Sequence, residues 1–198
     1  MNTRRAACIT LLVAAVATGC SSNSDDAKAP VTPTPSTAPT SPSATATTDA
    51  PSGPLKFGAA HHWTGTDPEG RPVSGTTTAI SYTQPATGVD LPDEAADFED
   101  SVWAVLEVKV CADKNSNTLI VSQAPWALGF PDDTRLQAPS LTGGGVPKPE
   151  YPATEGTVKA GTCVRGKITF SVEDGTRPNQ VIYAPAEQEP VEWAVPKA

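Results

Sequence analysis

Few side chains in this sequence are suited to metal or acid–base chemistry. His61 and His62 are the only histidines, and adjacent residues of a β-strand point to opposite faces, so they cannot easily bind one metal ion together. One of them with Asp67 or Glu69 would form a weak metal site. The alternative places one histidine on the surface and packs the other beside Trp63. We expect the second arrangement, and therefore neither a metal nor a cofactor.

No motif for covalent catalysis is present. The sequence lacks Gly-x-Ser-x-Gly, Ser-x-x-Lys and Cys-x-x-Cys, which are typical of hydrolases, penicillin-binding enzymes and redox proteins respectively. The run Gly143-Gly144-Gly145 is not followed by the Gly-Lys-Ser/Thr of a phosphate loop, so it is interpreted as a turn. We expect no catalytic residues and a protein that is not an enzyme. An enzyme whose site is assembled from distant loops is the alternative.

The N-terminus predicts export and lipidation. Arg4 and Arg5 precede an apolar run over residues 6–17, which at roughly 12 residues is too short to cross a bilayer. The segment Ala17-Thr18-Gly19-Cys20 resembles a bacterial lipobox, although Ala17 stands where Leu is usual. Residues 1–19 are therefore predicted to be a lipoprotein signal peptide and Cys20 the lipidated residue. The protein would then be anchored to the outer face of the cell membrane; ordinary secretion is the alternative.

The remaining cysteines indicate one disulfide. Cys8 would leave with the signal peptide and Cys20 would carry the lipid, so Cys111 and Cys163 remain. Neither has a His or Cys close by in the sequence, as a zinc site would need. An even pair in an oxidising compartment is typical of a disulfide.

Composition divides the rest of the chain in two. Residues 20–54 combine the lipidated cysteine with a tether of mostly Pro, Thr, Ser and Ala, which cannot bury enough apolar surface to fold and is predicted to be disordered. Residues 55–198 are long enough for one domain. The chain carries a net charge of −8, and the acidic balance argues against nucleic-acid binding, which needs clustered Lys and Arg.

Alternating hydrophobicity predicts that this domain consists of β-strands. In the strand predicted over residues 101–112, residues Val102 to Val110 of even number are apolar and form one face. Strands are also predicted over 76–84, with Thr78, Ile80 and Tyr82 on one face, and over 162–172. Weaker candidates span 55–63, 118–122, 126–130, 179–183 and 191–195, and residues 92–98 could form one helical turn. We expect an all-β, immunoglobulin-like antiparallel β-sandwich of seven to nine strands.

Strand parity also places the disulfide. Cys111 ends one strong strand and Cys163 begins another, and each alternates with an apolar, inward-facing neighbour, Val110 and Val164. The two cysteines are therefore predicted on the more polar face, joining neighbouring antiparallel strands outside the core. In the strand predicted over residues 162–172, Thr169 and Ser171 are expected to face outward together with Cys163.

Several segments together resemble a known group of exported proteins. They are LKFG (55–58), HHW (61–63), SVWAVLEVKVCAD (101–113), GTCVRGKITFSV (161–172), VIYAP (181–185) and VEWAV (191–195). They resemble the immunoglobulin-like domains of actinobacterial lipoproteins related to the mycobacterial immunoprotective extracellular antigen. The resemblance covers residues 55–198 and implies a β-sandwich. The family has no established catalytic residues, so it implies no functional site.

The remaining features suggest binding. The stretch DLPDEAADFED places six carboxylates between Asp90 and Asp100; without the spacing of a calcium loop, it is interpreted as a solvated loop, with binding of cations or a basic partner as the alternative. The four tryptophans could stack on a sugar or an aromatic ligand, and parity places Trp103 outside the core. Possible ligand contacts are thus Trp103, His61 and His62.

The function predicted from the sequence is that of a surface-anchored lipoprotein. Its immunoglobulin-like domain is expected to be non-catalytic and to bind an envelope protein or a cell-wall component, while the lipid on Cys20 binds the membrane. A ligand- or metal-carrying envelope lipoprotein is the alternative, which would need a pocket among the tryptophans.

Overall fold

The computed structural model describes residues 53–186 and 188–197. The predicted signal peptide, Cys20 and all but the last two residues of the predicted tether lie outside this range. In the described part, no helix is long and apolar enough to cross a membrane. The described residues form eleven strands and one short 3₁₀ helix. They are β1 Leu55–Lys56, β2 Ala60–Thr66, β3 Pro72–Thr83, η1 Asp93–Ala95, β4 Ser101–Ala112, β5 Leu119–Val121, β6 Trp126–Gly129, β7 Arg135–Gln137, β8 Gly156–Val158, β9 Cys163–Glu173, β10 Gln180–Tyr183 and β11 Val191–Ala194.

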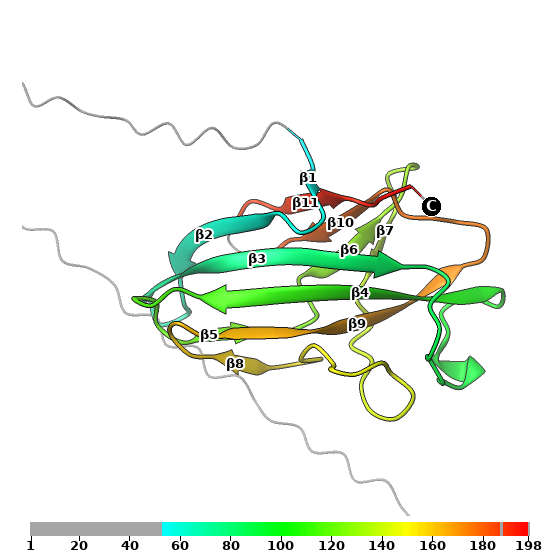
Figure 1. Ribbon diagram of the computed structural model, residues 1–198, viewed down its shortest axis with the longest axis horizontal. Helices are drawn as coiled ribbons and strands as arrows, with labels where there is room; N and C mark the ends of the chain where they lie inside the picture. The colour runs from blue at the N-terminus through cyan, green and yellow to red at the C-terminus, as the bar shows by residue number, and fades with distance from the viewer. Residues whose placement is uncertain (1–52, 187, 198) are drawn as a thin grey trace, which may run out of the picture. The chain divides into compact units, whose positions relative to one another are not determined.

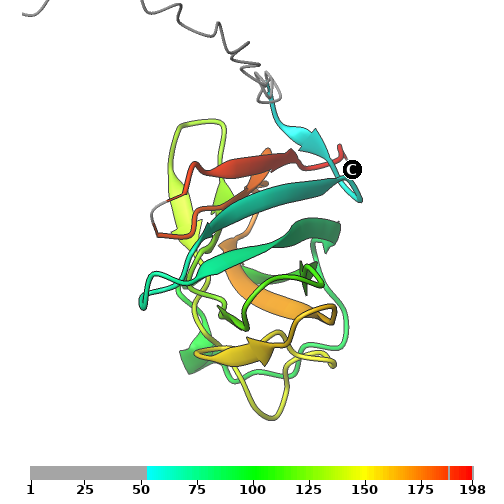
Figure 2. The same cartoon turned by 90° about the vertical axis from the view of Figure 1, so that its left-hand side faces the viewer.

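The strands form an immunoglobulin-like β-sandwich, which confirms the predicted fold. One sheet has the order β2-β3-β4-β9 and lies across the front of Figure 1, and the other has the order β1-β11-β10-β6-β7. Strands β5 and β8 form a separate antiparallel pair. Figure 2 views the domain from the end at which β2 turns into β3, with β11 and β2 in successive layers.

The eleven strands exceed the predicted seven to nine for two reasons. The strand predicted over 55–63 is divided, because the chain pairs first with β11 and then with β3. Gly58, with a φ of +84°, lies at this crossing, where a residue without a Cβ is favoured. Strands β7 and β8 are three residues long, too short for alternation to reveal. The helical turn predicted within 92–98 is η1.

The two longest paired strands, β4 and β9, follow the predicted parity. They pair antiparallel from Ser101–Glu173 to Cys111–Cys163 without interruption. In β4 the even-numbered residues from Ala104 to Ala112 are buried. On the opposite face of the sheet, Arg165 Nε donates to Glu107 Oε1 at 2.9 Å, which lowers the pKa of Glu107. The sheet is therefore apolar inside and charged outside.

Strand β3 departs from the predicted pattern. The sequence predicts that Thr78, Ile80 and Tyr82 share one face, and this is wrong. The register with β4 shifts between Ala79 and Ser81, so Ile80 is an extra residue in a β-bulge. A bulge reverses the parity of all later residues, and Tyr82 consequently packs against the core.

Part of the outward face of β9 is buried, which also differs from the prediction. Thr169 and Ser171 were predicted to face outward with Cys163, yet they are 3% and 1% exposed. Ser171 Oγ accepts from the backbone N–H of Asp97 at 3.0 Å and donates to Ser101 Oγ at 2.9 Å. The segment before β4 therefore covers this part of β9, which local alternation cannot predict.

The free edge of β9 is covered by a second segment, residues 149–151. Tyr151 N donates to Lys167 O at 3.0 Å, and Lys167 N donates to Pro149 O at 2.9 Å. A side chain at Gly166 would collide with the backbone at Glu150 and Tyr151. Glycine at this position therefore permits the close approach that closes the edge of the sheet.

Four aromatic residues fill the centre of the sandwich. Trp126 is fully buried, and its ring centroid lies 4.7 Å from Tyr183, 6.0 Å from Trp193 and 6.4 Å from Tyr151. Burial raises the pKa values of both tyrosines. Trp126 and Trp193 are consequently core residues and are not available to a ligand.

Candidate functional site

The predicted disulfide is present and lies where parity placed it. Cys111 and Cys163 are directly opposed residues of β4 and β9 and are bonded to each other. Cys111 is half-buried and Cys163 exposed, and neither belongs to the hydrophobic core. The bridge therefore joins two neighbouring strands on the outer face of one sheet and does not connect the two sheets.

The two histidines lie on opposite faces of the edge strand β2. His61 is half-buried, and this burial lowers its pKa. The charge of the neighbouring His62 lowers the pKa further, by a smaller amount. His62 is exposed, and its Nε2 lies 2.9 Å from Asp113 Oδ2, a contact that lowers the pKa of Asp113. Asp67, proposed from the sequence as a metal partner, is paired with Arg71. Among residues 53–186 and 188–197, no three potential metal ligands come together.

The three possible ligand contacts are not brought together. Trp103 is half-buried on the outer face of β4, eight residues from Cys111, which corresponds to about 26 Å of strand. His62 pairs with Thr76, which pairs with Cys111, so His62 lies at the opposite end of the sheet from Trp103. His61 faces the other side. No groove described below includes any of the three.

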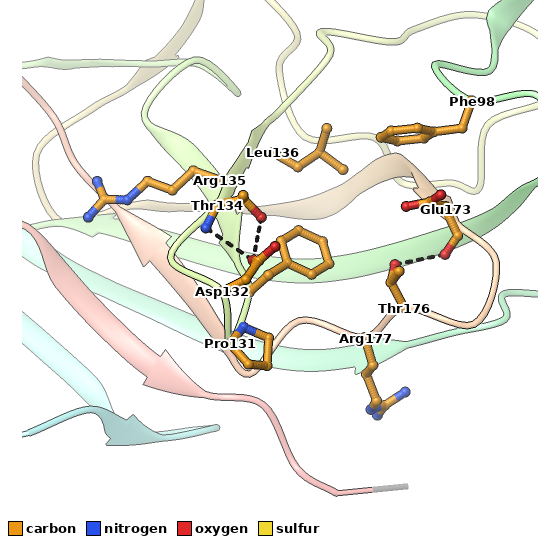
Figure 3. Close-up of a pocket in the computed structure, with 10 residues that line it drawn as sticks. Phe98, Pro131, Asp132, Thr134, Arg135, Leu136, Glu173, Thr176 and Arg177 are labelled. Carbon is orange, nitrogen blue, oxygen red and sulfur yellow. Dashed lines mark hydrogen bonds between the residues drawn. The ribbon is translucent and has the colours of Figure 1, made fainter.

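A groove lies at the end of the sandwich where β4 begins and β9 ends (Figure 3). It has a volume of about 550 Å³, which is within the usual range for ligand sites. We call it the acidic groove. Its walls combine apolar and charged side chains, namely Phe98, Phe130, Pro131, Leu136, Asp132, Arg135, Glu173 and Arg177, with Thr134 and Thr176.

Three loops, far apart in the sequence, build the acidic groove. They are the β3–β4 loop with Phe98, the β6–β7 turn with Asp132, and the β9–β10 loop that follows Glu173. Asp174 N donates to Asp100 O at 2.8 Å, which joins the first and third loops. Ser101 Oγ donates to Phe98 O at 2.6 Å. The aromatic ring is therefore presented by a segment whose backbone is held in place.

The Phe98 ring is the most unusual feature of the groove. It is 38% exposed, and in the described part of the chain only Ile120 is another large hydrophobic residue with such exposure. In Figure 3 the carboxylate of Glu173 points toward Phe98, whereas the guanidinium groups of Arg135 and Arg177 point away from it. The groove lining thus combines apolar surface with two carboxylates, those of Asp132 and Glu173, and with the two arginines.

Of the two arginines, Arg177 has other contacts. The Arg177 guanidinium lies 5.6 Å from the centre of the Tyr82 ring, within the range of a cation–π interaction. Its Nη2 donates to Pro196 O at 3.1 Å.

Asp132 accepts hydrogen bonds from both the side chain and the backbone N–H of Thr134, and these bonds lower the pKa of Asp132. Asp132 is therefore a charged carboxylate at neutral pH.

A second groove, also of about 550 Å³, lies at the opposite end of the sandwich. Trp63 and Tyr183 line it together with Leu119 and the exposed Ile120, and Asp67 and Arg71 lie at its rim. Trp63 Nε1 donates to Thr77 Oγ1 at 2.9 Å, which fixes the indole. Of the four tryptophans, only Trp63 lines one of these two grooves.

The acidic groove could not be identified from the sequence alone. Phe98, Glu173 and Asp132 lie in three separate segments, and nothing in local patterning shows that these meet. One signal was present: Phe98 is the only aromatic residue within the acidic stretch between Asp90 and Asp100. A large apolar side chain in a solvated loop is a reason to expect a contact surface.

Comparison with known proteins supports the fold. No protein-family model matches the sequence, and no curated protein matches it either. A solved structure similar to this one is that of MPT63, described as a secreted protein from Mycobacterium tuberculosis, with 17% sequence identity and a TM-score of 0.53. The match covers 72% of this chain and 98% of that chain. At this identity the likeness shows that the two proteins share a fold.

Proposed function

We propose that this protein is a lipoprotein on the outer face of the cell membrane, and that its β-sandwich is a non-catalytic domain that binds a partner in the cell envelope. The observation that carries the proposal is the disulfide between Cys111 and Cys163. Because Cys163 is exposed, reductants in the cytosol would reach the bond and break it. A disulfide of this kind is therefore typical of exported proteins, which are not exposed to those reductants.

The anchor is proposed from the N-terminal sequence. A charged segment, an apolar segment and small residues precede Cys20 in the order of a lipoprotein signal peptide. MPT63 is described as secreted, which agrees with export but does not bear on lipidation. The resemblance to immunoglobulin-like domains of actinobacterial lipoproteins supports both parts of the proposal.

The binding function is proposed from the acidic groove. Phe98 exposes apolar surface that the fold itself does not bury, and a backbone hydrogen bond between Asp174 and Asp100 joins two of the loops around it. A preorganised, partly apolar surface is suited to binding, because little conformational entropy is lost when a partner is bound.

The anchor can be tested by processing of the full chain in an actinobacterial host. We expect the intact mass of the wild-type protein to correspond to a mature chain that begins at lipid-modified Cys20 and fractionates with membranes. A Cys20→Ala variant should be released or remain unprocessed. Cys8→Ala, within the signal peptide, is the matched control and should be processed normally. An unmodified wild-type mature chain would refute the anchor.

The second groove supports a second candidate function, carriage of a small apolar ligand. Trp63 and Tyr183 offer aromatic surface in a volume that suits a small molecule. Native mass spectrometry of the protein extracted from its host would test this. A bound molecule that is lost in a Trp63→Ala variant, but retained in Trp103→Ala, would favour carriage.

A further inference from the structure

We propose that the acidic groove binds a cationic protein segment, in which an apolar side chain packs on Phe98 and flanking lysines or arginines meet the surrounding carboxylates. This inference deepens the proposed function, because it names the chemistry of the partner that the β-sandwich would bind. It depends on two properties of the groove, its charge and its apolar wall.

The charge of the domain is concentrated around the acidic groove. Residues 93–100, 130–135 and 173–177, in and beside its three loops, carry nine exposed carboxylates and two guanidinium groups, whereas the whole chain has a net charge of −8. These segments therefore have an excess of seven negative charges, which is close to the net charge of the whole protein. The carboxylates are those of Asp93, Glu94, Asp97, Glu99, Asp100, Asp132, Asp133, Glu173 and Asp174.

In the part of the chain that the structure describes, none of these nine carboxylates forms an ion pair. Five ion pairs occur within residues 53–186 and 188–197, and none of them involves the loops of the groove. Elsewhere the carboxylates of Asp67, Glu107, Asp113 and Glu150 each have a basic partner. Like charges held close together repel one another, so a polycation would relieve this repulsion and would be attracted over several ångströms.

The apolar wall determines what kind of cation fits. A solvated metal ion or a polyamine would use the carboxylates but would leave Phe98 uncovered. A peptide segment with one large apolar side chain would bury the ring and place basic groups near Glu173 and Glu99. Aromatic residues at the centre of an interface, surrounded by a charged rim, are typical of sites that dominate protein binding.

The test uses the full mature chain in a neutral detergent and a synthetic peptide in which lysines flank one phenylalanine. We expect saturable binding by titration calorimetry that weakens as salt is raised, since the charges are exposed. Phe98→Ala should weaken binding about tenfold or more, in line with the burial of one aromatic side chain. The pair Glu99→Gln and Glu173→Gln should weaken it about threefold or more and reduce its salt dependence.

Two controls separate this site from the rest of the surface. Ile120→Ala removes the other exposed hydrophobic side chain, and Glu155→Gln neutralises an exposed carboxylate outside the groove; neither should change the affinity. A peptide with glycine in place of phenylalanine should bind at least tenfold more weakly, and one with glutamates in place of lysines should not bind.

Three outcomes would overturn the inference. They are no binding of the lysine–phenylalanine peptide, unchanged affinity in the Phe98→Ala variant, and equal binding of the glycine peptide, which would indicate a nonspecific cation surface. Circular dichroism of each variant establishes that it is folded. If the peptide fails to bind while wild-type protein carries lipid on Cys20, the inference is wrong and the anchor in the proposed function stands.

Discussion

Removal of the disulfide tests the placement of the bridge outside the core. The bond closes a loop of 52 residues between Cys111 and Cys163. In the chain-entropy description, a loop of this length restricts the unfolded chain by about 14 cal/mol/K, or about 4 kcal/mol at 25 °C. Replacement of both cysteines by serine should therefore lower the free energy of unfolding by up to about 4 kcal/mol.

The position of the bridge predicts where this loss arises. Neither cysteine contributes to the core cluster, and serine hydroxyls on the outer face can bond to water. Almost all of the change should come from the unfolded chain, which becomes less restricted, so the folded structure should be unaltered. For about 144 folded residues, a loss of 4 kcal/mol corresponds to a decrease in melting temperature of about 13 °C.

Urea denaturation of the double variant and of the wild type, oxidised and reduced, would measure the effect. The reduced wild type is the matched control, because it lacks the bond but keeps both sulfur atoms. Both forms without the bond should show similar stability and a larger m-value, since the unfolded chain exposes more surface. A double variant that is much less stable than the reduced wild type would mean that the sulfurs fill core volume, and would refute the placement.

Three further predictions concern the edge, the core and the titration of the sandwich. Gly166→Ala should destabilise by about 1–3 kcal/mol in urea denaturation, because a methyl group collides with the segment that covers β9; Gly144→Ala, where space is open, should not. Trp126→Ala should cost about 3–5 kcal/mol in the same assay, whereas Trp103→Ala on the outer face should cost far less. Because the folded pKa of His61 lies below the unfolded value of 6.5, the unfolded chain binds the proton first as pH falls below 6.5. Stability should then decrease with falling pH in that range, and His61→Gln should reduce the slope in denaturation curves at successive pH values; an unchanged slope would contradict this.

Strand parity was a sufficient guide where a strand is long and regular. In β4 and β9 alternation located both faces and the disulfide, because side chains of paired strands must alternate together. It failed after Ile80, since a bulge inserts one residue without a sequence signal strong enough to show it. It also failed at Ser171, a small polar residue that is buried and forms hydrogen bonds with Asp97 and Ser101, 70 or more residues away.

The candidate site was less predictable than the fold. Each loop of the acidic groove has an ordinary turn or acidic composition, and only the sheet topology brings Phe98, Glu173 and Asp132 together. The tryptophans illustrate the opposite error, because large aromatic residues suggest a ligand platform, yet Trp126 and Trp193 fill the core. Composition identifies which residues are able to bind, whereas burial determines which of them can be reached.

The position of the disulfide has a mechanical consequence for the domain. Strands β4 and β9 carry the bridge at one end of their pairing, Cys111–Cys163, and border the acidic groove at the other, Ser101–Glu173. When a pulling force unfolds the domain, the disulfide prevents extension of the chain between Cys111 and Cys163, which are 52 residues apart. The unfolded chain is therefore shorter by about 180 Å. The ends of β4 and β9 at Cys111 and Cys163 therefore stay joined when the rest of the domain is extended.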